Sequence, residues 1–295
     1  ADEPSSLHEA AACGDWAHRA MNLIWAALIV AAVAAPAVAA MLLVRRRAPE
    51  GSYFSDGDRA SGVFGVLATG FSVLAGFVVF LSFTSYDKSR VGAEQEALAL
   101  GRQIETAQFL PAPVAAELSG ELVCYGRSVV HVEWPEAEAG EAVGDVNPWG
   151  VVLFRTVRLF EPQTPVQEAA YDKWLDHTAD REAARIDRVH GAEGVIPSPL
   201  WIVLILLSIV IVGYVLFFAD SAERAVSQGV LMGSVASTLA AMLLLIQFLD
   251  SPFKEGVGGI QPVAMERTLR TFDQALAAVG GEVDPPCDEQ GRRSS

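Results

Sequence analysis

Residues 200–219 read LWIVLILLSIVIVGYVLFFA, a stretch without a single charged side chain. A helix needs about 20 apolar residues to cross the hydrocarbon core of a bilayer, and helices of soluble cores seldom run so long without a charge. Three other stretches meet the same requirement, so the sequence predicts four transmembrane helices. They occupy residues 20–44, 61–86, 199–219 and 229–249.

The composition of the 295 residues agrees with a membrane protein. Hydrophobic residues make up 52% of the chain and charged residues 19%, against about a quarter charged in a typical globular protein. The net charge is nevertheless −15, so the acidic residues concentrate outside the apolar stretches. This pattern excludes a disordered chain, a small disulfide-stapled domain and a basic nucleic-acid-binding protein.

Four spans place alternate segments on opposite sides of the membrane. One side receives segment 1–19, insert 87–198 and tail 250–295, in which a helix is expected near 262–278, and the other receives linker 45–60 and turn 220–228. The first apolar stretch is longer than that of a secretory signal, and arginines follow rather than precede it, so we interpret it as a retained span.

The distribution of basic residues gives a weak indication of sidedness. Arg45, Arg46, Arg47 and Arg59 lie in the first linker, and cytoplasmic loops carry an excess of such residues. These arginines favour an extracytoplasmic insert. They are opposed by basic residues beside the other ends of the spans, namely Arg19, Lys88, Arg90 and Lys254.

The insert is predicted to be helical throughout and to carry the excess of acid. Thr164, followed by Pro165 and by Gln167, has the pattern of a helix start, whereas Trp134-Pro135 is expected to end the preceding helix. Residues 87–198 contain ten basic and nineteen acidic side chains, a net charge of about −9. Such a domain beside a pore would attract cations and repel anions; the alternative is that these acids only keep the surface soluble.

The second span carries the most informative pattern for function. Val73, Phe77 and Leu81 share one helical face, and in a ring of subunits this face would form an apolar constriction that gates by dewetting. The alternative is that it packs against another span. Small residues let helices approach closely, so three glycines are candidate helix-packing positions: Gly65, Gly70 and Gly76. The centres of the spans carry no Asp, Glu, Lys or Arg, which argues against a proton-coupled pump.

Candidate catalytic or metal-binding residues are sparse. His131 lies two residues before Glu133, and Asp176, His177 and Asp180 form a separate cluster on the last predicted helix of the insert. His177 points away from the face that Asp176 and Asp180 share, so we predict no metal site. A nucleophile motif and a phosphate-binding loop are also missing from the sequence, so we expect neither an enzyme nor a bound cofactor.

The three cysteines are scattered along the chain. Cys13, Cys124 and Cys287 all fall on the side of the insert, and outside the cytoplasm Cys13 could pair with Cys287 and tie the termini together. The alternative is that all three are free thiols.

Several segments together resemble the bacterial bestrophin-like family, whose members are distantly related to bestrophin channels. They are LAGFVVFLSFTSYDKSRVGAEQEALAL at 74–100, VEWPE at 132–136, FEPQTPVQEAAY at 160–171, PSPLWIVLILLSIVIVGYVLFFA at 197–219 and FLDSPFKEGVGGIQPVAMERTL at 248–269. The resemblance covers residues 60–275 and implies an all-α protein of the bacterial inner membrane, with four spans and a helical aqueous domain inserted between spans 2 and 3.

The resemblance also implies a function. Bestrophins assemble as pentameric ion channels whose pore is lined by the second span. By position, this implies Val73, Phe77 and Leu81 at the pore neck, with Phe80 and Thr84 as neighbours. The acidic calcium clasp is not recognisable here, so calcium gating is not implied. The helical domain of bestrophins is cytoplasmic, in contrast to the sidedness that the basic residues favour.

Two functions therefore follow from the sequence. The first is a homo-oligomeric, pentameric ion channel that favours cations. The second is a non-catalytic accessory or scaffold subunit of a larger membrane complex.

Overall fold

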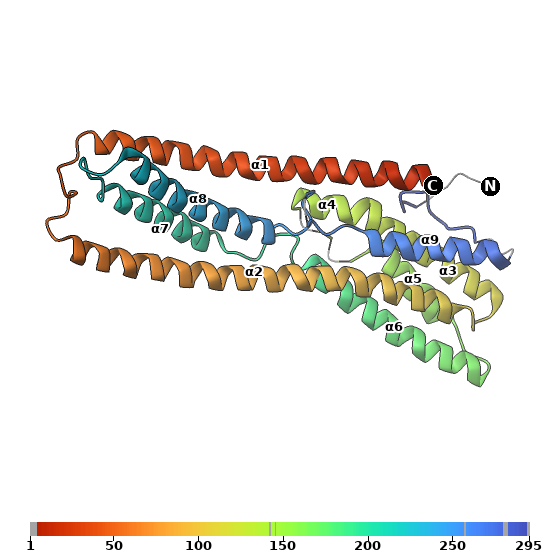
Figure 1. Ribbon diagram of the computed structural model, residues 1–295. Helices are drawn as coiled ribbons and strands as arrows, with labels where there is room; N and C mark the ends of the chain where they lie inside the picture. Colours follow the sequence, from red (N-terminus) through yellow and green to blue (C-terminus); the bar gives the residue numbers. More distant parts are fainter. Residues whose placement is uncertain (1–4, 142, 145, 257, 280–282, 294–295) are drawn as a thin grey trace. The chain divides into compact units, whose positions relative to one another are not determined.

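The computed structural model is helical, and it divides into two compact units (Figure 1). It describes residues 5–141, 143–144, 146–256, 258–279 and 283–293, with side chains from residue 23 onwards, and among these residues no β-strand forms. One unit, here called the membrane unit, comprises Ala1–Phe83 and Val195–Asp250; the other, the helical domain, comprises Thr84–Gly194 and Ser251–Ser295. Helix α2 (Gly57–Ala107) contributes to both.

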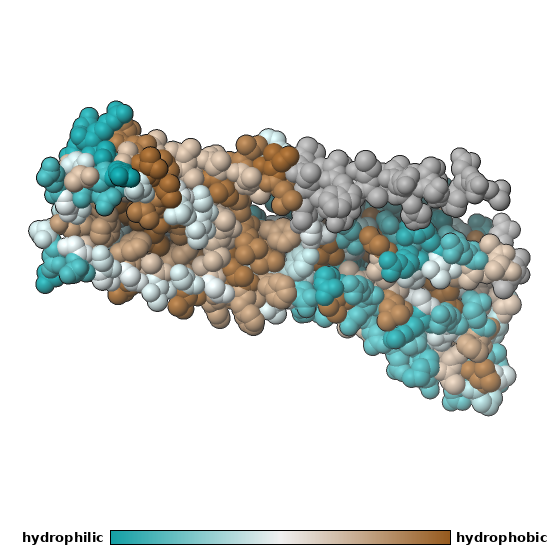
Figure 2. All heavy atoms as spheres, in the orientation of Figure 1, coloured by the Kyte–Doolittle hydropathy of each residue, from teal (hydrophilic) through white to brown (hydrophobic). Residues whose placement is uncertain are grey.

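The membrane unit is built from α1 (Ser5–Arg45), the first half of α2, α7 (Ser198–Leu216) and α8 (Ala225–Leu249). These four helices are the ones long and apolar enough to cross a membrane among the described residues, as the sequence predicted. Helix α1 begins at Ser5, well before the predicted span, so residues 5–19 are part of the same helix. Apolar side chains cover much of this unit in the space-filling view (Figure 2).

The helices of the membrane unit pack through small and branched side chains. Gly233 of α8 lets Val38 of α1 approach closely, since a Cβ on this glycine would lie 3.3 Å from Val38 Cγ2. Phe71 and Val78 of α2 pack with Leu204 of α7 and Ile246 of α8 in a buried cluster. One face of α2 is therefore fixed against α7 and α8.

Polar or aromatic contacts hold the chain at both ends of the membrane unit, the end where α7 begins and the end with the loops that follow α1 and α7. The Asp250 carboxylate accepts hydrogen bonds from the backbone N–H groups of Val195 and Ile196, at 2.7 and 3.0 Å, just before α7 begins. At the loop end, Phe54 stacks on Tyr214 with ring centroids 5.4 Å apart, and the Arg45 guanidinium donates to the Ser221 carbonyl at 3.1 Å. Aromatic residues gather in this way where a membrane meets water.

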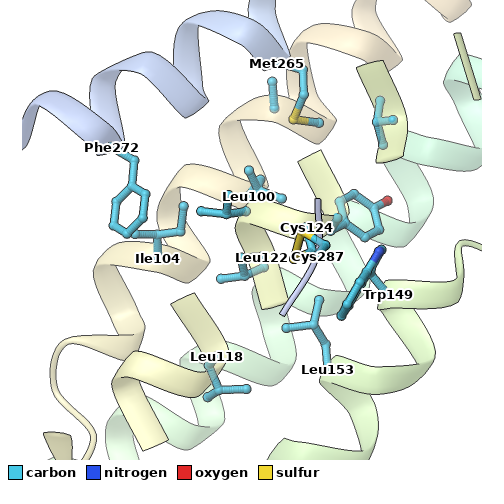
Figure 3. Close-up of a cluster of buried hydrophobic side chains, with 14 of the residues drawn as sticks. Leu100, Ile104, Leu118, Leu122, Cys124, Trp149, Leu153, Met265, Phe272 and Cys287 are labelled. Carbon is cyan, nitrogen blue, oxygen red and sulfur yellow. A yellow bond between two sulfur atoms is a disulfide. The ribbon is translucent and has the colours of Figure 1, made fainter. Parts of the chain in front are cut away.

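The helical domain consists of the second half of α2 and a run of shorter helices. These are α3 (Ala112–Ser128), α4 (Trp134–Ala139), α5 (Pro148–Leu159), α6 (Pro165–Val189) and α9 (Val263–Val279), with a π-helical turn, η1 (Val129–Glu133), between α3 and α4. Their core contains Leu100, Leu122, Trp149, Leu153 and Phe272 (Figure 3).

Two local expectations can be compared directly with these helices. The predicted start of α6 is confirmed: Thr164 is its N-cap and accepts a hydrogen bond from the Gln167 N–H at 3.2 Å. The predicted helix end at Trp134-Pro135 is wrong, because the chain continues from α3 through η1 into α4 without a break. Pro135 directly follows the π-helical turn, in which the Trp134 N–H bonds to the Val129 carbonyl, so the regular i→i−4 pattern that a proline would interrupt is already replaced there.

Both alternatives for the cysteines, a pairing of Cys13 with Cys287 and three free thiols, are wrong. Cys287 forms a disulfide with Cys124 of α3, and the two Cα atoms are 5.8 Å apart (Figure 3), a separation typical of disulfides. The reason is that the tail folds back over α3: Gly120 leaves room for it, since a Cβ there would lie 3.3 Å from the Asp284 carbonyl oxygen. Cys13 lies outside the residues whose side chains are described.

Candidate functional site

The membrane half of α2 has one buried and one exposed face. Phe71, Ala75 and Val78 are at most 5% exposed and pack inside the membrane unit. With 3.6 residues per turn, Val73 and Phe77 lie on the opposite side of the helix, and they are 68 and 58% exposed. The helices of the same chain therefore leave this face uncovered.

All five residues that the sequence and the resemblance assigned to the neck are exposed on α2. Phe80 and Leu81 are exposed beside Phe77 in the membrane unit, and Thr84 is exposed at the start of the helical domain. The alternative was that this face packs against another span. In the structure, no described span of the same chain covers it. The face remains available to lipid, to another copy or to a pore.

The three candidate packing glycines do not act within the chain. A Cβ placed on Gly65, Gly70 or Gly76 would meet no described atom within 4 Å, so no helix approaches them closely in the described part of the chain. The close approach on α2 lies instead at Gly92, where a Cβ would be 2.5 Å from the Arg188 backbone nitrogen. This contact brings α6 against α2 inside the helical domain.

A buried network of charged residues surrounds this contact. Arg188 of α6, 0% exposed, forms ion pairs with Glu96 of α2 and with Glu133 of η1. Arg185 adds a second ion pair to Glu133 at 3.1 Å, and the Tyr125 hydroxyl donates to Glu96 at 2.6 Å. The network joins α2, α3, η1 and α6.

The network perturbs the ionisation of its members. Burial alone would raise the pKa of the Glu133 carboxyl, but the guanidinium groups of Arg188 and Arg185 outweigh burial and hold this pKa below its usual range. Burial and the nearby Glu96 raise the pKa of the Tyr125 hydroxyl well above its usual range. Glu133 is therefore ionised and Tyr125 neutral at physiological pH, and each is engaged with a partner inside the protein.

Arg181 extends this network by one helical turn. Its guanidinium donates to Gln103 of α2 at 2.7 Å and lies over the Tyr125 ring, 4.5 Å from the centroid. The role of these arginines is not evident from the sequence, because alternating charge also marks solvated helices. Their spacing was the available signal: Arg181, Arg185 and Arg188 fall at i, i+4 and i+7, on one face of α6.

The side chains considered for metal binding have other contacts. Glu133 pairs with arginines, Asp176 pairs with Lys173 at 2.9 Å, and His177 Nδ1 lies 3.9 Å from an Asp180 oxygen. In the part of the chain that is described, no three His, Cys, Asp or Glu side chains come together in a way that could hold a metal ion.

Comparison with known proteins identifies the family. The model of the Bestrophin-like domain matches residues 31–265. The chain belongs to the bestrophin-like family. The family match includes most of the membrane unit and of the helical domain. The search of curated proteins found no match.

Solved structures support the same fold. A variant of a bacterial bestrophin homologue from Klebsiella pneumoniae has a TM-score of 0.61 and 13% identity, and the match covers 84% of this chain and 99% of that one. The homologue from the same organism that was phased on zinc has a TM-score of 0.58 and 13% identity over 88 and 99% of the two chains. A further solved membrane protein has a TM-score of 0.61 and 14% identity over 88 and 99%.

Membership in this family supports a membrane protein of channel type rather than an enzyme. The all-helical fold with four membrane-spanning helices, which the sequence and the resemblance predicted, is that of these bestrophin homologues.

Proposed function

We propose that this bestrophin-like protein is a homo-oligomeric ion channel whose pore is lined by the exposed face of α2. The observation that carries the proposal is the two-sidedness of this helix. Its buried face is fixed by α7 and α8, while Val73, Phe77, Phe80 and Leu81 form an exposed apolar surface. In a ring of copies such a surface makes a hydrophobic constriction, which blocks ions when it dewets.

Self-association is supported independently by the surface of the helical domain. Leu98, Phe109, Phe154, Leu159 and Ile186 are between 52 and 78% exposed, and large apolar side chains of this kind mark interaction sites where they form a contiguous patch. A groove of about 610 Å³ between α2 and α9 is lined by apolar side chains that include Leu98 and Phe272 and by charged ones that include Arg102, Glu105 and Arg267. We propose that neighbouring copies cover these surfaces, and that the ring contains five copies as in bestrophins.

The first test is the mass and composition of the native particle after purification in detergent. A particle of about five identical copies supports the channel. A particle built mainly from other proteins overturns it and favours the accessory subunit, whose exposed surfaces would then be covered by foreign chains.

The second test is electrical. We expect Phe77→Ala to raise the leak conductance of the protein reconstituted in planar bilayers, because the substitution widens the neck and makes it less apolar. Phe83→Ala is a matched control: Phe83 is 53% exposed on the same helix but lies about 120° around it from Phe77. Unchanged current in Phe77→Ala, or an equal rise in both variants, would remove Phe77 from the gate.

We also propose that the helical domain faces an extracytoplasmic, oxidising compartment. The disulfide between Cys124 and Cys287 supports this placement, since such bonds persist outside the cytoplasm and are rare within it. Arg45, Arg46 and Arg47 at the opposite loop agree with it.

The disulfide itself is buried, so the test uses an exposed position of the helical domain: in a Cys13→Ser background, Glu182→Cys should react with an impermeant maleimide in intact cells. Reaction only after lysis would place the domain in the cytoplasm, as in bestrophins.

A further inference from the structure

The membrane unit contains an apolar cavity of about 500 Å³ between α1, α7 and α8. Its walls include Ile29 and Val33 of α1, Ile205 and Val212 of α7, and Leu239 and Leu243 of α8. This volume lies within the range of pockets that hold small ligands. We propose that the cavity binds a lipid acyl chain.

The chemistry of the walls selects an apolar ligand. Among the described residues that line the cavity, Trp201, Ser208 and Gln247 carry polar groups. The Ser208 hydroxyl already donates to the Leu204 carbonyl at 2.8 Å, and the Trp201 indole N–H points to Asp250 Oδ2, 3.4 Å away. Since the other lining side chains apart from Gln247 are apolar, a polar ligand would lose most of its hydration here without equivalent hydrogen bonds, whereas an alkyl chain loses nothing.

The cavity is also open to the surrounding medium. Ile29, Val33, Ile205 and Ile209 line it and are between 45 and 61% exposed. All four lie in helices long and apolar enough to span a bilayer, so the medium at their depth is the hydrocarbon of lipid tails. Acyl chains are therefore the apolar groups present at the opening, and one of them can enter from the side.

An acyl chain in this position would touch the helices that hold the pore-facing helix. Leu239 belongs both to the cavity wall and to the buried cluster that fixes Phe71 and Val78 of α2. The ligand would also fill the space that separates α1 from α7. The proposal concerns binding alone and does not depend on conduction.

Trp201 offers a direct readout, because bromine atoms on an acyl chain quench the fluorescence of a nearby indole. The protein is reconstituted in vesicles of dibrominated phosphatidylcholine or of the unbrominated lipid. The contribution of Trp201, one of six tryptophans, is obtained by difference from Trp201→Phe. We expect strong quenching of Trp201 in the wild-type protein.

Substitutions that fill the cavity distinguish a bound chain from the lipid around the protein. Ala240→Leu places a larger side chain in the cavity, and Ala241→Leu is its control, since Ala241 is exposed on α8 outside the cavity. Val33→Phe fills the same space from α1 and provides a second variant if Ala240→Leu does not fold. We expect quenching of Trp201 to be lost in both filling variants and retained in Ala241→Leu.

Quenching that stays unchanged in the filling variants overturns the proposal, because the quenching lipid would then lie around the protein and not in the cavity. A final comparison identifies the source of the chain. Dibromostearate added to detergent-solubilised protein quenches Trp201 if a free fatty acid suffices. If only the brominated phospholipid quenches, the chain must belong to a membrane lipid.

Discussion

At the scale of single residues, Arg188 is expected to contribute strongly to stability. It is completely buried and pairs with two carboxylates, Glu96 and Glu133. Removing one partner from a buried ion pair leaves uncompensated charge and costs about 3–5 kcal/mol. We therefore predict that Arg188→Met lowers the free energy of unfolding of the purified protein by about this amount, measured by denaturant titration in detergent.

Arg90→Met is the matched control for this prediction. Arg90 also pairs with two carboxylates, Asp87 at 2.9 Å and Glu94 at 3.2 Å, but its side chain is 46% exposed. Exposed pairs contribute about 0–1 kcal/mol, so this variant should be close to the wild type. Equal losses of unfolding free energy in the two variants would mean that burial does not determine how much the Arg188 network contributes to stability.

The same network shows what could be read from the sequence at this scale. The shared face of Val73, Phe77 and Leu81 on α2 was predictable, because their spacing places them together on any helix, whereas its exposure was not, since the sequence also allowed packing against another span. The role of Glu133 was not: its partners Arg185 and Arg188 are more than fifty residues away, and only the tertiary structure brings them together.

At the scale of helices, the contact between α2 and α6 depends on Gly92. A Cβ at this position would lie 2.5 Å from the Arg188 nitrogen, 2.8 Å from the Ala184 oxygen and 2.9 Å from the Asp187 carbonyl carbon. All three are backbone atoms, so the helices must separate to admit it. We predict that Gly92→Ala lowers the free energy of unfolding by about 1–3 kcal/mol, measured in the same titration.

Gly101→Ala separates this steric effect from the general effect of alanine in a helix. A Cβ on Gly101 would lie 3.5 Å from Thr268 Cγ2, an ordinary contact. Since alanine favours a helix over glycine by about 0.5–1 kcal/mol, this variant should be neutral or more stable. A loss as large as that of Gly92→Ala would contradict the steric explanation.

Helices were predicted better from the sequence than their connections were. Uninterrupted apolar stretches identified the spans because length and hydropathy are local properties. The continuation of α3 through η1 into α4 was missed, since a proline in the first turn of a helix looks the same as one that ends the previous helix. The pairing of Cys124 with Cys287 was missed because the tail returns across 163 residues, which spacing alone does not reveal.

At the scale of the whole molecule, the charge of the helical domain decides the expected selectivity. Three buried glutamates, Glu96, Glu121 and Glu133, are matched in number by three buried arginines, Arg181, Arg185 and Arg188. These buried charges cancel, so they do not account for the net charge of about −9 in residues 87–198. In a ring of copies, this charge would raise the local concentration of cations and lower that of anions.

We accordingly predict that the channel prefers potassium to chloride, and that salt weakens this preference. Reversal potentials measured across a KCl gradient should shift toward the potassium equilibrium potential at low ionic strength. The Debye length falls from about 30 Å at 0.01 M to about 3 Å at 1 M, so a preference set by surface carboxylates should shrink near 1 M salt. A preference for chloride would contradict the role of the acidic domain. A potassium preference that survives 1 M salt would instead place selectivity at the neck around Phe77, where contact with the ion is too close for screening.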